Sequence, residues 1–258
     1  MDNATAASVK AILTSSLSKT LGRRADEDPY DPERFRLTSP FHSRLVPDAI
    51  WKASKFERSF VTSIGQGVFE QVAVYIAKGV GNKAEQGHRQ NGLIWKGQQD
   101  QIASIITGIR SKKEPPNWEK EVAAVIASKG IGTQIETSVI SDVYIKRKDK
   151  SEYFYSFKTV LPNLDQTAKA KEDSLTLKAM SPAYNAIFAL PYNPYISRQE
   201  YKWSHANKVF NMRLDPCVLI GEELWDQIGG NGTYKELLEI FEEVGAEFKA
   251  KIQKYLDS

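Results

Sequence analysis

Asp142, Ser156 and Lys158 are the residues of this chain whose types and spacing could do chemistry together. Ser156 and Lys158 are two residues apart, so in an extended strand their side chains point to the same face. A protonated lysine cannot bind a metal ion, but it can hold an attacking water or neutralise a phosphate oxygen beside one. A metal-bound aspartate next to such a lysine predicts hydrolysis of a phosphodiester bond.

A second carboxylate is expected on the helix that follows Lys158. At about 100° per residue, Glu172 falls beside Ala179, on the predicted core-facing side of this helix. An apolar stripe defines that side, with Leu164, Ala168, Leu175 and Ala179. A carboxylate there is costly unless it is paired or bound to a metal. Two carboxylates held ~4 Å apart repel by ~1–4 kcal/mol, and Mg²⁺, which prefers hard oxygen ligands, removes that repulsion. We therefore expect Asp142 and Glu172 to share a Mg²⁺ ion.

A β-hairpin would position Asp142 beside Lys158. Residues 141–158 contain two runs rich in β-branched and aromatic side chains, separated by a polar turn at 148–151. Asp142 is expected to open the first strand and Lys158 to lie near the end of the second. A helix over 164–180 and a buried strand over 184–192 would follow. This order predicts a right-handed crossover, a parallel pairing with the Lys158 strand, and a mixed sheet with helices on both faces.

Helical periodicity dominates the rest of the chain. The predicted helices cover residues 4–21, 47–62, 65–79, 97–110, 117–128 and 233–256. The polar stretch 81–95 is expected to be a loop or a short edge strand. Glu70 lies off the apolar stripe of its helix. It could be a further carboxylate of the metal site or a surface glutamate, and spacing alone favours neither.

The composition is that of a soluble globular protein, with 41% hydrophobic and 26% charged residues. The single cysteine, Cys217, excludes an internal disulfide and an all-cysteine zinc site, and it is expected to be a buried, unreactive side chain. The chain contains no apolar run of ~18 residues and no secretory signal. We therefore expect no membrane association and an intracellular location.

A net charge of only +3 means that any DNA-binding surface must be a local patch. Two segments mix basic with aromatic side chains, residues 34–44 and residues 193–213. Arginine and lysine bind phosphates and guanine edges, and asparagine reads adenine. The expected DNA contacts are Arg44, Arg198, Lys202, Asn207 and Arg213. The alternative is that both segments are loops packed over the core.

Asp142, a hairpin, and then Ser156-Phe157-Lys158 together resemble the PD-(D/E)xK nuclease core. That pattern is loose, but five further segments strengthen it. In the same order along the chain, they resemble the TdeIII-type family of type II restriction endonucleases, from about residue 39 to the C-terminus. The segments are SPFHSRL at 39–45, SFVTSIGQGVFE at 59–70, KTVLPN at 158–163, LPYNPY at 190–195 and GGNGTYKELL at 229–238.

The resemblance implies an α/β, restriction-endonuclease-like fold in one domain over residues 1–258. Its central mixed β-sheet would be flanked by helices and carry helical N- and C-terminal additions. Its parts would be a mainly helical half (1–130), a catalytic hairpin–helix–strand core (138–192), and a DNA-contact segment with the C-terminal helix (193–258).

The resemblance also implies an activity and partners. Members of this family cut double-stranded DNA at short palindromes, associated with GGNCC-type sites. We therefore expect Mg²⁺-dependent cleavage that leaves 5′-phosphate ends, with Mn²⁺ able to substitute. A homodimer, a partner DNA methyltransferase and the cytoplasm of a prokaryotic cell follow from such an activity.

One departure from the family pattern concerns the residue two before the lysine, which is normally acidic but here is Ser156. Some restriction enzymes of this superfamily carry a serine there and take the second acid from the next helix. Glu172, fourteen residues after Lys158, fits that arrangement. The resemblance thus implies a metal bound by Asp142, Glu172 and the Phe157 carbonyl.

The resemblance gives two further residues a role. Lys158 would position the water, and Glu70 matches the glutamate of the helix that precedes the sheet. Two alternatives remain for the chain as a whole. One is a DNA-binding protein whose cleavage Ser156 has weakened, and the other is a metal-dependent phosphohydrolase of small substrates.

Overall fold

The computed structural model describes residues 1–27, 29–65, 67–111 and 113–257. The chain divides into two compact units, one of residues 1–72 with 235–258, the other of residues 73–234. Of the residues predicted as a mainly helical half (1–130), residues 1–72 group in the first unit and residues 73–130 group with the sheet. That both units belong to one restriction-endonuclease-like domain stays a prediction.

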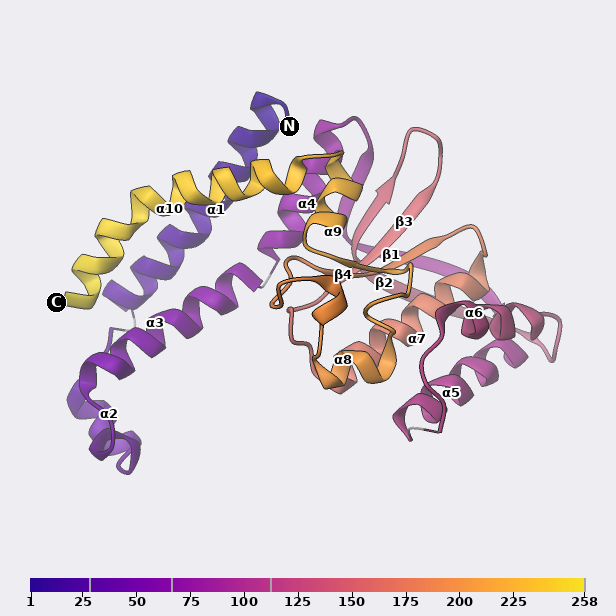
Figure 1. The fold of residues 1–258 in the computed structure, drawn as a ribbon, viewed down its shortest axis with the longest axis horizontal. Helices are drawn as coiled ribbons and strands as arrows, with labels where there is room; N and C mark the ends of the chain where they lie inside the picture. The colour runs from indigo at the N-terminus through magenta and orange to yellow at the C-terminus, as the bar shows by residue number, and fades with distance from the viewer. Residues whose placement is uncertain (28, 66, 112, 258) are drawn as a thin grey trace. The chain divides into compact units, whose positions relative to one another are not determined.

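The first unit is helical. It contains α1 (Asn3–Gly22), α2 (Pro32–Thr38), α3 (Asp48–Gly65), the first residues of α4 (Val68–Gly79) and most of α10 (Thr233–Asp257), with short turns at Arg23–Glu27 and His42–Arg44. The Asp2 side chain caps α1 by accepting the Thr5 N–H. Helices α1, α3 and α10 lie side by side (Figure 1), linked by the Lys10–Glu243 ion pair and by the rings of Phe56 and Tyr255.

The second unit is built on a five-stranded sheet in the order β1 to β5: β1 (Lys83–Trp95), β2 (Gln134–Lys146), β3 (Glu152–Phe157), β4 (Asn185–Leu190) and β5 (Val218–Ile220). The first three strands pair antiparallel, and β3–β4 and β4–β5 pair parallel. The predicted hairpin, the parallel pairing and the mixed α/β sheet are confirmed. A positive φ of 72° at Lys150 closes the hairpin turn.

The first two strands differ from the sequence prediction. Residues 83–95 form a full 13-residue strand instead of a loop or a short edge strand. It pairs with β2 from Lys83↔Lys146 to Trp95↔Gln134. Because β1 is an edge strand, most of its polar side chains can remain exposed while its backbone bonds to β2. Asp142 does not open its strand, since β2 begins eight residues earlier at Gln134.

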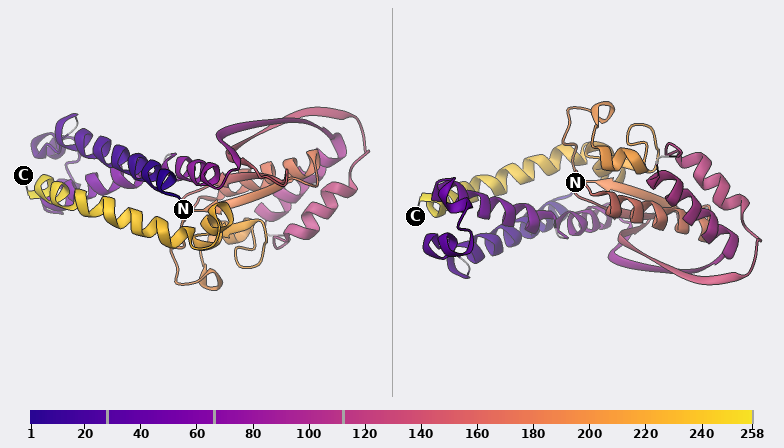
Figure 2. Two further views of the ribbon diagram at one scale, coloured as in Figure 1. Left: turned by 90° about the horizontal axis from the view of Figure 1, so that it is seen from above. Right: turned by 90° about the horizontal axis from the view of Figure 1, so that it is seen from below.

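Helices flank both faces of the sheet. On one face α5 (Lys96–Arg110), α6 (Trp118–Ala127), α7 (Leu164–Met180) and α8 (Ser204–Val209) pack together over Phe154, Phe188 and Leu190 (Figures 1 and 2). On the other face α9 (Glu222–Gly229) packs through Trp225 against Phe157. Alternate β3 side chains point to opposite faces, so Phe154 contacts the α7 layer while Phe157 contacts α9. Among the described helices, none is long and apolar enough to span a lipid bilayer.

Candidate active site

Asp142 and Lys158 form an ion pair at the open end of the hairpin. The Lys158 Nζ donates to Asp142 Oδ2 at 2.9 Å, and the two side chains are 22% and 32% exposed. The register between β2 and β3, in which Val143 pairs with Tyr155, places Ser156 next to Asp142. The Ser156 hydroxyl lies 3.5 Å from Asp142 Oδ2, at the outer limit of a hydrogen bond. The three residues picked from the sequence are therefore brought together.

Lys158 also contacts the backbone. It directly follows β3, and its N–H donates to the Ala189 carbonyl of β4 at 3.0 Å, which holds the residue in line with the sheet. Its Nζ donates to the Phe157 carbonyl oxygen at 2.9 Å. One carboxylate oxygen and one carbonyl oxygen thus converge on a single ammonium. Oxygens of these two kinds are the ligands that Mg²⁺ and Ca²⁺ accept.

Glu172 does not face the core, and this part of the prediction is wrong. Its side chain is 49% exposed, and its carboxylate lies 3.5 Å from the Lys169 ammonium. The apolar stripe did not identify the buried side of α7, because this helix is buried around most of its circumference. The buried positions include the polar residues Thr167, Lys171 and Ser174. Closeness to Ala179 on the helix therefore does not identify a buried side chain.

The neighbouring Asp173 is the less exposed of the two adjacent α7 carboxylates. Its side chain is 25% exposed, and it accepts an ion pair from Lys169 at 2.9 Å. Burial raises the pKa of Asp173, while Lys169 and, to a smaller extent, Lys158 act to lower it. The sequence analysis passed over Asp173, although its spacing of four residues from Lys169 marks a helical ion pair.

The Asp142 carboxylate and the Phe157 carbonyl oxygen are ligands of the kind that Mg²⁺ binds. Within the described ranges, no three histidine, cysteine, aspartate or glutamate side chains form a group that could hold a metal. Mg²⁺ does not need such a group, because it keeps several waters and binds through one or two carboxylates. Asp142 and the Phe157 carbonyl would supply two oxygens of such a set.

Glu70, the remaining predicted catalytic residue, lies in the first turn of α4, within the helical unit. Val68 and Val72 of this helix are buried, and Glu70 is half-buried, off their stripe as expected. Its part in catalysis stays a prediction.

The predicted DNA-contact residues separate into two groups. Arg198 is occupied inside the protein, because its guanidinium donates to the Met212 and Asp215 carbonyls and pairs with Glu223. The Asn207 amide likewise donates to two backbone carbonyls, at residues 201 and 203. Three of the five expected contacts have exposed side chains, namely Arg44, Lys202 and Arg213.

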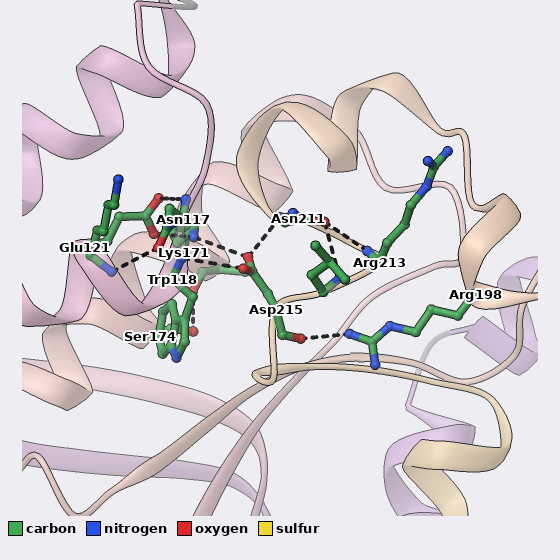
Figure 3. Close-up of polar contacts among 12 residues, drawn as sticks. Asn117, Trp118, Glu121, Lys171, Ser174, Arg198, Asn211, Arg213 and Asp215 are labelled. Atoms are coloured by element: carbon green, nitrogen blue, oxygen red, sulfur yellow. Dashed lines mark hydrogen bonds and ion pairs between the residues drawn. The ribbon is translucent and has the colours of Figure 1, made fainter.

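A buried ionic network holds α7 against its neighbours (Figure 3). The Lys171 side chain is fully buried, its ammonium contacts the Glu121 carboxylate of α6, and it lies 4.0 Å from an Asp215 oxygen. The same ammonium lies over the rings of Trp118 and Phe210, 5.3 and 4.4 Å from their centroids. The network therefore ties α7 to α6 and to the loop before β5. It also fixes the rotation of α7 about its axis.

Comparison with known proteins gives the family. Residues 5–245 match the family described as "Type II restriction endonuclease, HinfI". The type II restriction enzyme HgiEI of Herpetosiphon aurantiacus is 34% identical over 260 residues, which cover 96% of this chain and 93% of HgiEI. Two further type II restriction enzymes of that organism, HgiBI and HgiCII, are 33% and 32% identical and each cover 84% of the chain and 81% of their own length.

No solved structure matches the chain. The resemblance to type II restriction enzymes that the sequence motifs indicated is confirmed, since the match spans both units and includes the hairpin with Asp142 and Lys158. The chain therefore belongs to the HinfI family of type II restriction endonucleases.

Proposed function

We propose that this type II restriction endonuclease hydrolyses double-stranded DNA with a Mg²⁺ ion bound at Asp142, in a PD-(D/E)xK type of site. The convergence of Asp142 Oδ2 and the Phe157 carbonyl on one cation, the Lys158 ammonium, at 2.9 Å each is the observation that supports this most directly. Two oxygens that already share a monovalent cation are placed to share a divalent one. Mn²⁺ is expected to substitute, since it also accepts oxygen ligands.

Each residue of the hairpin has a role in this proposal. Asp142 and the Phe157 carbonyl would hold the metal, which when bound supplies a Lewis acid for the scissile phosphate. Lys158 carries three N–H donors, so it can orient a water for in-line attack and also neutralise a phosphate oxygen. The Ser156 hydroxyl, close to Asp142 Oδ2, would help to orient the carboxylate without adding a charge.

The second carboxylate comes from α7. Glu172 is the residue predicted from the sequence, and Asp173 is its neighbour on the helix. Glu70 would support the site through water or through Lys158.

The expected target is a GGNCC-type palindrome, cut to leave 5′-phosphate and 3′-hydroxyl ends. A palindrome presents the same phosphate on both strands, so a two-fold homodimer is the assembly that fits it. Exposed Arg44, Lys202 and Arg213 are the proposed DNA contacts, while Arg198 and Asn207 hold the segment that carries Lys202 and Arg213. A partner methyltransferase would protect host DNA in the cytoplasm of a prokaryotic cell.

A digest of unmethylated phage DNA tests the proposal. Discrete fragments are expected with Mg²⁺, but not with EDTA or with the Asp142→Ala variant, and sequenced ends would give the site and the stagger. Cleavage that persists in EDTA would refute the role of the metal. Metal-independent DNA binding without cleavage would instead favour a DNA-binding protein weakened at Ser156. Hydrolysis confined to small phosphodiesters would favour the phosphohydrolase.

A further inference from the structure

We propose that a cavity in the helical unit binds one nucleotide of DNA that has left the base stack. The cavity lies between α2, the segment that precedes it and the N-terminal half of α3, and its volume is about 660 Å³. A volume of that size is typical of a site for a small organic ligand, and a phosphate alone would leave most of it empty. The inference rests on DNA being the substrate, as in the proposed function, but not on the metal site.

An aromatic wall forms part of the cavity. The ring of Phe35 on α2 contacts those of Tyr30 and Trp51, with centroids 5.8 and 4.9 Å away, and all three residues line the cavity. Each of them is partly exposed, so part of the wall remains open to a ligand. Bases of every kind stack on aromatic side chains. The wall therefore suits the planar base of a nucleotide.

Two arginines accompany this wall. Arg34 and Arg58 line the same cavity, both side chains are exposed, and within the described ranges neither guanidinium has an ion-pair partner. Asp31 is the one carboxylate among the described lining residues, and its Oδ1 accepts the N–H groups of Glu33 and Arg34. A guanidinium binds phosphate oxygens through two parallel hydrogen bonds. The base and the phosphate of a nucleotide thus each have a matching group.

Two of the five segments by which the chain resembles restriction enzymes meet at this cavity. Ser39 and His42 belong to SPFHSRL, Ser59 begins SFVTSIGQGVFE, and all three residues line the cavity. None of them has a role in the proposed metal site. Their hydroxyl and imidazole groups can form hydrogen bonds with the polar edge of a base. The cavity therefore gives these two segments a role that the hairpin does not.

The state of the DNA provides the test, because a base reaches such a cavity only after it has left the duplex, which costs free energy. Two duplexes are compared by fluorescence anisotropy in EDTA, so that cleavage does not interfere. One 5-iodo-2′-deoxyuridine stands unpaired in the first duplex and is paired with adenine in the second. The first should bind ~5-fold or more tightly, because its base is already free to stack on the wall. Under ultraviolet light this base should cross-link to Tyr30, Phe35 or Trp51, as mass spectrometry would show.

Arg58→Gln and Arg23→Gln are a matched pair of variants. Each removes one exposed arginine from the helical unit, but Arg58 lines the cavity and Arg23 lies outside its lining. Arg58→Gln should weaken binding of the first duplex by ~5-fold or more, and Arg23→Gln by less than about 2-fold. Far-UV circular dichroism confirms that each variant is folded. An excess of thymidine 5′-monophosphate should suppress the cross-link, and the same concentration of inorganic phosphate should not.

Equal affinity for the two duplexes would overturn the inference, because the cavity would then hold at most a backbone phosphate. Equal losses in Arg58→Gln and Arg23→Gln, or a cross-link outside the cavity, would overturn it as well. Binding of the mononucleotide without any cross-link to DNA would show a site for free nucleotides instead.

The digest of phage DNA with Mg²⁺ separates these outcomes from failure of the proposed function. If the unmodified protein cuts that DNA but fails the tests with the two duplexes, only the nucleotide site is refuted. A protein that neither cuts nor binds DNA would refute both.

Discussion

Replacement of Lys171 by methionine should strongly destabilise the sheet unit. Lys171 is fully buried, and its ammonium is the cation next to Glu121 and Asp215 (Figure 3). Methionine retains most of the side-chain volume and its contact with the rings of Trp118 and Phe210. The substitution therefore removes the charge while leaving the packing nearly unchanged.

Glu121 is the residue that this substitution leaves uncompensated. Asp215 still accepts the N–H of Asn211 at 2.8 Å and that of Trp118 at 3.4 Å. Glu121 keeps one backbone donor, Asn117, at 2.8 Å, and loses the cation at its other oxygen. Removing one partner of a buried ion pair costs about 3–5 kcal/mol. For a chain of this size each kcal/mol lowers the melting temperature by about 2–4 °C, so a fall of roughly 6–20 °C is expected.

The assay is urea unfolding followed by both circular dichroism and tryptophan fluorescence, because only coincident transitions justify a single free energy of unfolding. Lys120→Met, at an exposed lysine on α6, is the matched control and should change that free energy by less than about 0.5 kcal/mol. Adding Glu121→Gln to Lys171→Met should recover part of the lost stability, since a neutral amide needs no counter-ion. A loss below about 1 kcal/mol in Lys171→Met would refute the reasoning. A double variant as unstable as Lys171→Met would show that packing, and not charge, causes the loss.

Three further predictions concern other parts of the sheet unit. Gly97→Ala should destabilise the protein by about 1–3 kcal/mol, because a Cβ there would lie 2.6 Å from a side chain of the turn after α6. A Cβ added at Gly108, on the same helix, would have no other atom within 4 Å, so Gly108→Ala should stabilise the protein by about 0.5–1 kcal/mol. Thermal unfolding of the two variants measures both changes in stability. The hydrogen bond from Tyr144 holds the pKa of Glu152 below its ordinary 4.5, so the charged form stabilises the fold above that pH. Glu152→Gln should therefore cost about 1 kcal/mol at neutral pH, and urea titrations should show this difference disappearing as the pH falls below 4.5. Burial raises the pKa of the Cys217 thiol, so Ellman's reagent should react with it only in denaturant, and rapid reaction of the folded protein would contradict the burial.

The sequence by itself determined the local elements and the pair at the centre of the site. Helical periodicity located α1, α3, α5, α6 and α7 within a few residues, because side-chain spacing along a helix is a local property. The hairpin and the position of Lys158 directly after β3 followed from two short apolar runs and a polar turn. A tight hairpin leaves little freedom between its strands, so Asp142 and Lys158 had to be neighbours.

Only the tertiary structure decided which side chains of α7 are buried. The sequence fixes the angle between Glu172 and Asp173 on the helix, but not the rotation of the helix itself. That rotation depends on contacts with distant residues, such as the buried pair between Lys171 and Glu121, fifty residues apart. The length of β1 was also decided by the tertiary structure. Its polar residues form a strand because their backbone pairs with β2, about fifty residues later in the chain. Periodicity describes a segment, whereas burial and orientation are properties of the packed fold.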